Sequence, residues 1–268
     1  MSSTANTFQL STESAQAYER TFVPAMLAEW VGYLVEAAGI APGQSVLDVA
    51  CGTGIVARTV SDRIDGAGRV VGLDLNEGML AVARGIRPDL EWHHGDAGDL
   101  PFPTGSFDTV LCQAGLMFFP DRVKALREMG RVATPDGTVA VQVWGRLESQ
   151  PGYGPFAEVA ARHAGPDARE VISSYFSLGD LAVVAALFED AGLPVSTTTT
   201  RLGTVRFPSI DEFVRAEIDS SPLVDRIDDD VYARIVHDCR EALAQFATAD
   251  GRAEVPLEGH VITARKRG

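Results

Sequence analysis

The nine residues VLDVACGTG, from Val46 to Gly54, decide the fold of this chain. They predict a buried strand that carries an acidic residue and runs into a glycine turn. Gly52 and Gly54 allow the backbone to turn tightly and to approach a ligand closely, because neither has a Cβ. Residues 55–64 predict a helix directly after the turn, so the N–H groups of a helix N-terminus lie at the same point. We therefore expect a nucleotide-type ligand there.

Asp48 discriminates between two kinds of ligand that the glycine turn could bind. The spacing Gly52-x-Gly54-x-x-Ala57 also fits the dinucleotide fingerprint G-x-G-x-x-G/A, which places a pyrophosphate at the helix N-terminus. Asp48 lies four residues before the first glycine, and a carboxylate there would repel a pyrophosphate. The same carboxylate suits a ligand that carries an ammonium group. The turn therefore favours a ligand with an ammonium group over a dinucleotide.

Acidic residues also stand at the ends of the next two predicted strands. Residues 69–74 predict a second strand that ends in Asp74. Asp74 follows Gly52 at about the 20-residue spacing expected for a carboxylate that binds ribose hydroxyls. This feature does not discriminate, since NAD and other adenosine ligands share that ribose. Residues 91–97 predict a third strand that ends in Gly-Asp-Ala.

The order and spacing of these motifs over residues 44–144 resemble the class I S-adenosylmethionine (SAM) dependent methyltransferases. LDVACGTG, residues 47–54, is similar to the first motif of that family. Gly95-Asp96-Ala97 followed by Leu100-Pro101-Phe102 is similar to the ubiquinone/menaquinone-biosynthesis type, whose members methylate small molecules. The resemblance implies SAM as the cofactor, S-adenosylhomocysteine as its product, and a Rossmann-like fold.

The resemblance also implies which residues hold the cofactor. Asp96 would accept a hydrogen bond from the adenine amine, and the N–H of Ala97 would meet the adenine ring. Asp74 would bind the ribose, Gln113 would end the fourth strand beside the amino group, and Tyr18 would close over the sulfonium. Two apolar residues that follow Asp74 would pack on the adenine face. The full predicted set is Tyr18, Asp48, Ala50, Gly52, Gly54, Asp74, Leu75, Met79, Asp96, Ala97 and Gln113.

The composition favours a small-molecule substrate over a nucleic acid. The chain has 23 Lys and Arg against 37 Asp and Glu, a formal net charge of −14. Binding to nucleic acid depends largely on positive surface, so no nucleic-acid partner is expected. No apolar run is long enough to span a bilayer, and residues 1–12 lack the features of a signal peptide, so a cytoplasmic protein is expected. The three cysteines are too few and too scattered for a metal cluster, and no metal site is expected.

Strands alternate with helices over residues 45–144, which predicts βαβ units and a parallel sheet. The expected fold class is α/β, with a seven-stranded Rossmann-like sheet, an antiparallel last strand at residues 258–265, and a helical cap. We expect residues 1–268 to form one domain with a SAM-binding core at about 40–145. The substrate cap would consist of residues 1–38, 146–176 and 208–250.

Local signals predict the helices outside the core. Residues 14–38 predict a helix that is broken near Pro24. Ser177-Leu-Gly-Asp180 resembles a capping box and predicts a helix through Ala191. Further helices are expected at residues 156–163, 209–219 and 230–246.

The acceptor is expected to be a small apolar or aromatic molecule. Phe118, Phe119, Trp144 and Tyr153 are candidates to line its pocket. A hydroxyl acceptor would benefit from a general base, and His163 in the predicted cap is the catalytic candidate. An amine or thiol that is already deprotonated needs no base, only alignment of nucleophile, methyl and sulfur.

Two alternative functions stay open. An NAD(P)-dependent oxidoreductase would share the fold, but it needs a catalytic pair such as Tyr-Lys. Lys124 and Lys266 are the only lysines, and neither has a tyrosine near it in sequence. A non-methylating protein, such as a cyclase or a regulatory binding module, would keep the same SAM site. A measurement of methyl transfer distinguishes that protein from a methyltransferase. The sequence does not indicate the oligomeric state.

Overall fold

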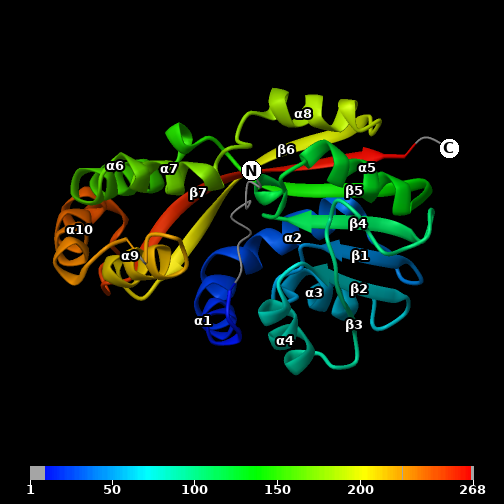
Figure 1. Ribbon diagram of the computed structural model, residues 1–268, viewed down its shortest axis with the longest axis horizontal. Helices are drawn as coiled ribbons and strands as arrows, with labels where there is room; N and C mark the ends of the chain where they lie inside the picture. Colours follow the sequence, from blue (N-terminus) through cyan, green and yellow to red (C-terminus); the bar gives the residue numbers. More distant parts are fainter. Residues whose placement is uncertain (1–9, 225, 267–268) are drawn as a thin grey trace, which may run out of the picture.

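The computed structural model describes residues 10–224 and 226–266. Within these residues, seven strands form one sheet in the order β3-β2-β1-β4-β5-β7-β6 (Figure 1). β7 runs antiparallel to β5 and β6, and the other neighbouring pairs are parallel. The predicted seven-stranded, mostly parallel sheet is confirmed. The strands are β1 Ser45–Val49, β2 Arg69–Asp74, β3 Glu91–His94, β4 Phe107–Gln113, β5 Ala133–Trp144, β6 Val195–Phe207 and β7 Ala253–Arg265.

Both faces of the inner strands are apolar, because successive side chains point to opposite faces. Val46 of β1 packs with α2 (Ala28–Ala38) and α3 (Ile55–Arg63), whereas Leu47 belongs to the cluster on the other face. That second face is covered by α5 (Arg122–Val132) and α8 (Leu181–Asp190), while α4 (Glu77–Ile86) packs at β2 and β3. Such two-sided burial is typical of parallel strands in α/β folds.

The N-terminal helix is interrupted where the sequence predicted a break. α1 (Thr12–Phe22) continues into a π-helical turn, η1 (Val23–Leu27), and then into α2. η1 contains Pro24, which has no N–H for the regular ladder, so a widened turn is a natural accommodation.

α2 packs against the sheet, which differs from the expectation that residues 1–38 all belong to the cap. Trp30 lies on the β6–β7 ladder over two glycines: a Cβ built on Gly203 or Gly259 would come within 2.9 or 2.6 Å of its ring. Trp30 also meets the ring of Trp144 edge-on at 5.3 Å. The apolar face of α2 therefore forms sheet core, and residues 1–9 of the predicted cap lie outside the described residues.

Four helices gather at one end of the molecule, where β6 and β7 extend past β5 (Figure 1). They are α6 (Tyr153–Ala164), α7 (Pro166–Tyr175), α9 (Ile210–Asp219) and α10 (Asp229–Ala242). Phe156 of α6 meets Phe213 of α9 at 5.5 Å within the same buried cluster. These helices come from the two later segments of the predicted cap, so the topology brings those segments together.

One helix was not predicted, and the starts of α8 and β7 differ from the predicted ones. α7 was not predicted; Pro166 begins this helix, where its missing N–H is not needed. α8 begins after Asp180 and not at Ser177, since the Asp180 carboxylate accepts a hydrogen bond from the N–H of Ala182 at 2.9 Å. β7 begins at Ala253 because its ladder with β6 continues to that residue. Three 3-10 turns complete the described elements: η2 Leu116–Phe118, η3 Leu147–Ser149 and η4 Ala244–Phe246.

Candidate active site

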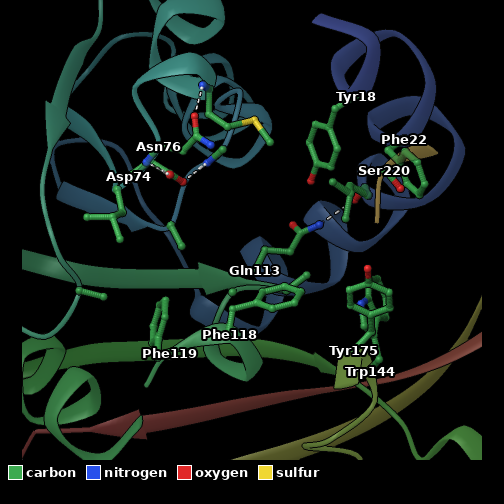
Figure 2. A pocket seen from close by; sticks show the side chains of 18 of the residues that line it. Tyr18, Phe22, Asp74, Asn76, Gln113, Phe118, Phe119, Trp144, Tyr175 and Ser220 are labelled. Atoms are coloured by element: carbon green, nitrogen blue, oxygen red, sulfur yellow. Dashed lines mark hydrogen bonds between the residues drawn. The ribbon is translucent and has the colours of Figure 1, made fainter. Parts of the chain in front are cut away.

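A cavity of about 300 Å³ lies where the carboxyl ends of β1, β2 and β4 meet α1 and the cap helices. This edge of a parallel sheet is the usual ligand site of open α/β folds. In Figure 2, Asp74 and Asn76 lie at one side of the cavity, Trp144 and Tyr175 at the other, and Gln113 between them. All but two of the predicted cofactor residues line it: Tyr18, Ala50, Gly52, Asp74, Leu75, Met79, Asp96, Ala97 and Gln113.

Asp74 joins the glycine turn to the end of β2. Its Oδ2 accepts a hydrogen bond from the N–H of Gly52 at 2.8 Å, and its Oδ1 accepts one from the N–H of Asn76 at 2.8 Å. Burial raises the pKa of Asp74, while these backbone N–H groups act in the opposite direction. The Asn76 side chain caps α4 by accepting from the N–H of Met79 at 3.0 Å. Asp74 is thus held in place before any ligand binds.

Asp48 and Gly54 do not line the cavity. Asp48 is 1% exposed, and its Oδ2 accepts from the N–H of Ala57 in the first turn of α3 at 3.1 Å. Burial raises the pKa of Asp48 to about 8, against the effect of that hydrogen bond. Gly54 has φ +88°, and a Cβ on it would lie 2.3 Å from the ring of Trp92. Both residues therefore support the turn on the side away from the cavity. Direct contact of Asp48 with a ligand amino group stays a prediction.

The end of β4 carries an unusual backbone and a buried amide. Ala50 after β1 and Ala114 after β4 have φ +57° and +49°, left-handed conformations that cost a residue with a Cβ ~1–2 kcal/mol. Such strain clusters at functional sites. Gln113 is 9% exposed, and its Nε2 donates to the carbonyl of Leu27 in η1 at 2.9 Å. Its Oε1 is buried and has no hydrogen-bond partner in the described residues.

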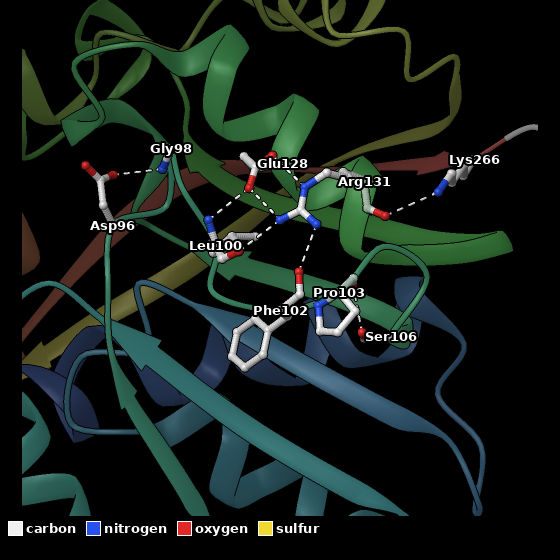
Figure 3. Close-up of polar contacts among 9 residues, drawn as sticks. All are labelled: Asp96, Gly98, Leu100, Phe102, Pro103, Ser106, Glu128, Arg131 and Lys266. Carbon is white, nitrogen blue, oxygen red and sulfur yellow. Dashed lines mark hydrogen bonds and ion pairs between the residues drawn. The ribbon is translucent and has the colours of Figure 1, made fainter.

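The predicted adenine end is built from the loop after β3. Asp96 Oδ1 accepts from the N–H of Gly98 at 2.8 Å (Figure 3), Ala97 is buried, and Leu75 is 39% exposed at the cavity. Met79 is buried against Ala15 and Tyr18 of α1.

Glu128 and Arg131 of α5 anchor the Leu-Pro-Phe segment that follows (Figure 3). Glu128 Oε2 accepts from the N–H of Leu100 at 2.9 Å. Arg131 donates to the carbonyls of Leu100 and Phe102 at 2.9 and 2.8 Å. The side chains of Glu128 and Arg131 also pair with each other at 2.7 Å. These contacts fix the loop that carries Asp96 and Ala97 to the body of the domain.

Aromatic side chains dominate the opposite end of the cavity. The residues predicted to line an acceptor pocket, Phe118, Phe119, Trp144 and Tyr153, are all among its walls. Tyr175 and Phe176, at the end of α7, join them, and the rings of Phe118 and Tyr175 lie 5.7 Å apart. This half of the cavity suits a flat apolar molecule.

Glu217 is the acidic residue that the sequence analysis missed. It lies on α9, lines the aromatic end of the cavity and is 7% exposed. Its Oε1 accepts a hydrogen bond from Tyr153 Oη at 2.7 Å. Burial raises the pKa of Glu217 to about 7, and the Tyr153 hydrogen bond opposes that rise. The sequence holds one signal for it: Ile210, Phe213 and Glu217 share the buried face of α9 at helical spacing, so an acid interrupts an apolar stripe.

His163 does not lie at the cavity. Its Nε2 is 2.8 Å from Asp238 Oδ2, so it links α6 to α10 on the outer side of the cap. The structure therefore corrects the expectation that His163 faces the acceptor. Within the described residues, no group of three or more His, Cys, Asp and Glu is placed to hold a metal ion.

Comparisons with known proteins agree with this geometry. A family model described as "Methyltransferase domain" matches residues 46–137. The demethylmenaquinone methyltransferase of Renibacterium salmoninarum is 44% identical over 131 residues, which are 48% of this chain and 52% of that protein. The demethylmenaquinone methyltransferase of Lysinibacillus sphaericus is 32% identical over 178 residues, which are 61% of this chain and 76% of that protein. The chain spans about half the length of most of the curated relatives it matches.

Solved structures share the fold at low sequence identity. The YcgJ protein of Bacillus subtilis superposes with a TM-score of 0.60 and 20% identity, covering 90% of this chain and 99% of that one. None of the helices in residues 10–224 and 226–266 is both long enough and apolar enough to cross a membrane. Because the motifs, the fold and the long match to the Lysinibacillus protein agree, the chain belongs to the class I SAM-dependent methyltransferases of the quinone-biosynthesis type.

Proposed function

We propose that this protein transfers the methyl group of SAM to a small apolar, aromatic acceptor. One observation carries the proposal: a single cavity joins the residues of the methyltransferase motifs, such as Gly52, Asp74 and Asp96, to an aromatic chamber bounded by Trp144 and Tyr175. The net charge of −14 supports a small-molecule acceptor over a nucleic acid. The names of the relatives, which include demethylmenaquinone and 2-phytyl-1,4-beta-naphthoquinone methyltransferases, favour a naphthoquinol-like ring system.

Two features of the site support the fit of SAM. The Cβ position of Gly52 has nothing within 4 Å, so this glycine borders open space that a side chain would fill. The buried Oε1 of Gln113 is an acceptor without a hydrogen-bond partner in the described residues, as an amino group would require. Asp74 would bind the ribose hydroxyls with lone pairs that Gly52 and Asn76 leave available. Asp96 and Ala97 would hold the adenine.

When bound, SAM supplies an electrophilic methyl group on a positively charged sulfur. The chain contributes alignment, because Gln113 and Tyr18 lie between the adenosine end and the aromatic chamber. It also contributes exclusion of water, because Phe118, Trp144 and Tyr175 wall the acceptor end. A water-poor site strengthens the electrostatic interactions of an anionic nucleophile with the sulfonium.

The oxidoreductase alternative loses support at the site, whereas the non-methylating alternative does not. An oxidoreductase would need a lysine near the cavity, but Lys124 and Lys266 are not among its lining residues. Lys266 is instead bound to the backbone at the end of α5 and the start of β5. Its ammonium donates to the carbonyl of Ala133 at 2.8 Å and to the carbonyl of Arg131 at 3.3 Å (Figure 3 shows the second contact). A SAM-binding protein that does not methylate would keep the same cofactor contacts, so turnover must separate it from the proposed enzyme.

Calorimetric titration with SAM, S-adenosylhomocysteine and NAD, followed by an acceptor screen, tests the proposal. We expect micromolar binding of the adenosyl ligands and no heat from NAD. We then expect release of S-adenosylhomocysteine with naphthoquinols, and mass spectrometry should find one added methyl group on the acceptor. Binding of NAD alone would overturn the assignment of the cofactor. Binding of SAM with conversion of the acceptor but no added methyl group would favour the non-methylating alternative.

A further inference from the structure

The aromatic end of the cavity contains the carboxylate of Glu217, which forms no ion pair with the Lys, Arg and His side chains that the structure describes. Glu217 lies among Tyr153, Tyr175, Phe176 and Trp144, which together with it wall this chamber. Within the described residues, no Lys, Arg or His lies within 4.0 Å of the Glu217 carboxylate, so it forms no ion pair. Acids are rarely buried without a charged partner, because removal of a carboxylate from water is costly.

The hydrogen bonds of Glu217 are only partly made within the protein. Tyr153 Oη donates to Oε1, and the described residues supply no hydrogen bond to Oε2. A carboxylate can accept about four hydrogen bonds, so most of its capacity is left for a molecule in the chamber. A purely structural acid at this position would be expected to have a second donor.

The groups around Glu217 are neutral hydroxyls. Tyr153 on α6 and Tyr175 on α7 face it, and the pKa of each phenol is raised by burial and by the charge of Glu217. Ser220, which directly follows α9, also lines the cavity, and its hydroxyl donates to the carbonyl of Ala216. Glu217 is therefore the group of this chamber that can take up a proton near neutral pH, since the pKa of the carboxyl is raised to about 7.

We propose that Glu217 is the general base of the reaction and accepts the proton of a hydroxyl on a hydroxyaromatic acceptor. The acceptor O–H bond breaks, its proton forms a bond to a Glu217 oxygen, and its electron pair stays on the acceptor as an aryloxide. That electron pair, or the ring carbon that it activates, then forms the bond to the methyl carbon as the methyl–sulfur bond breaks and its electron pair stays on sulfur. When the ring carbon is methylated, it afterwards loses its own proton to solvent, and the oxygen takes up a proton, which restores the hydroxyaromatic ring. This inference rests on the proposed methyl transfer and narrows the acceptor class to one with an ionisable hydroxyl.

Three naphthalene probes test the proposal with protein saturated in S-adenosylhomocysteine, so that no turnover is needed. They are 2-naphthol, 2-methoxynaphthalene, which lacks the proton, and 2-(aminomethyl)naphthalene, which carries a cation. At pH 8.5 we expect 2-naphthol to bind wild-type protein about tenfold more tightly than 2-methoxynaphthalene, as a hydrogen bond to a charged acceptor implies. Glu217→Gln should reduce this ratio to about threefold or less. Glu212→Gln, the same change on the exposed face of α9, should leave it unaltered.

Fluorescence supplies a second readout, because 2-naphthol becomes a strong acid when excited. Bound to wild-type protein it should emit as naphtholate at pH 8.5, since an adjacent base takes its proton, and it should emit as naphthol when bound to Glu217→Gln. Equal emission from both proteins would overturn the proposal, as would failure of 2-naphthol to bind. A preference for 2-(aminomethyl)naphthalene over 2-naphthol that depends on Glu217 would also overturn it, in favour of recognition of a cation.

Different results would overturn the proposed methyl transfer and the proposed role of Glu217. The affinity for S-adenosylhomocysteine should be equal within about twofold in wild type, Glu217→Gln and Glu212→Gln. In Figure 2, Asp74 lies across the cavity from Tyr175, the phenol that faces Glu217. Loss of S-adenosylhomocysteine binding in wild type would overturn the proposed function. Normal binding of S-adenosylhomocysteine together with naphthol emission from all three proteins would overturn only the assignment of Glu217.

Discussion

The N–H of Gly52 donates a hydrogen bond to Asp74 Oδ2 at 2.8 Å, which ties the glycine turn after β1 to the acid that ends β2. The other carboxylate oxygen of Asp74 accepts from Asn76, so one side chain fixes the backbone on both sides of it. Both Gly52 and Asp74 line the cavity. The conformation of the turn therefore depends on the position of Asp74, the acid that is expected to bind the ribose.

Asp74→Asn should weaken the binding of S-adenosylhomocysteine by ~1.5–3 kcal/mol, the value of a hydrogen bond to a charged group. The amide also presents an NH₂ group where the carboxylate accepts two backbone N–H donors, so the melting temperature should fall as well. Calorimetry and thermal unfolding measure the two effects. Asp62→Asn, which removes only a surface partner of Arg87, is the control and should retain wild-type affinity. Unchanged affinity in Asp74→Asn would show that the ribose binds elsewhere.

Gly52→Ala should abolish cofactor binding while the protein still folds. The new Cβ meets no protein atom within 4 Å but enters the space assigned to SAM, and φ +55° adds strain of ~1–2 kcal/mol. We expect at least a tenfold loss of affinity for S-adenosylhomocysteine. Gly66→Ala, with φ +66° and open space around its Cβ, carries the same strain away from the cavity and is the matched control. Equal affinity in both variants would contradict the assigned position of the cofactor.

Gly54→Ala should mainly affect folding stability. We expect it to lower the free energy of unfolding more than Gly52→Ala does. Its Cβ would lie 2.3 Å from Trp92 Cη2, so the ring must move in addition to the strain from φ +88°. Overpacking of this kind adds ~1–3 kcal/mol. Urea unfolding of the two variants measures the difference, and equal stability would indicate that Trp92 repacks without cost.

Local pattern was sufficient to predict which residues line one end of the cavity. Gly52, Asp74 and Asp96 each belong to a short motif at the end of a strand, and the parallel sheet brings such ends to one edge. The sequence also predicted the aromatic walls, because Phe118 and Trp144 lie near the ends of β4 and β5.

The chemistry of the acceptor end could not be predicted in the same way. The surroundings of Glu217 come from α6, α7 and α9, which are far apart in sequence and meet only through tertiary packing. His163 was selected by residue type, since histidine is the usual base near neutral pH. Burial lets a glutamate reach the same range, and burial depends on the fold.

Glu217→Gln should make stability less dependent on pH. The pKa of Glu217 is raised in the folded protein from 4.5 to about 7, so the folded state holds the proton more tightly than the unfolded chain. Wild-type stability therefore falls as pH rises from 4.5 to about 7, by ~3 kcal/mol from this group. Glu217→Gln should gain that amount relative to wild type between pH 5 and 8, measured by urea unfolding. Glu212→Gln should show no such gain, and a parallel pH dependence in Glu217→Gln and wild type would contradict the raised pKa.

Tyr153→Phe should raise the pKa of Glu217 further. The Tyr153 hydroxyl donates to the carboxylate at 2.7 Å and so favours its charged form, which the substitution removes. Carbon-13 NMR of labelled glutamate should show one carboxyl signal that titrates at higher pH than in wild type and that disappears in Tyr153→Phe/Glu217→Gln. Tyr232→Phe removes a buried hydroxyl that has no hydrogen-bond partner in the described residues, and it serves as the control. An unchanged or lowered titration point in Tyr153→Phe would exclude control of the carboxyl by this hydrogen bond.

His163→Ala should leave ligand binding intact and weaken the packing of α6 on α10. Its imidazole lies 2.8 Å from the Asp238 carboxylate, and neither residue lines the cavity. We expect affinities for S-adenosylhomocysteine and 2-naphthol, and turnover of any acceptor found in the screen, to stay within about twofold of wild type, because the imidazole lies outside both halves of the site. The melting temperature should fall, and Asp238→Asn should lower it in the same way because it breaks the same contact. A large loss of turnover in His163→Ala with normal stability would restore the histidine as the base and displace Glu217 from that role.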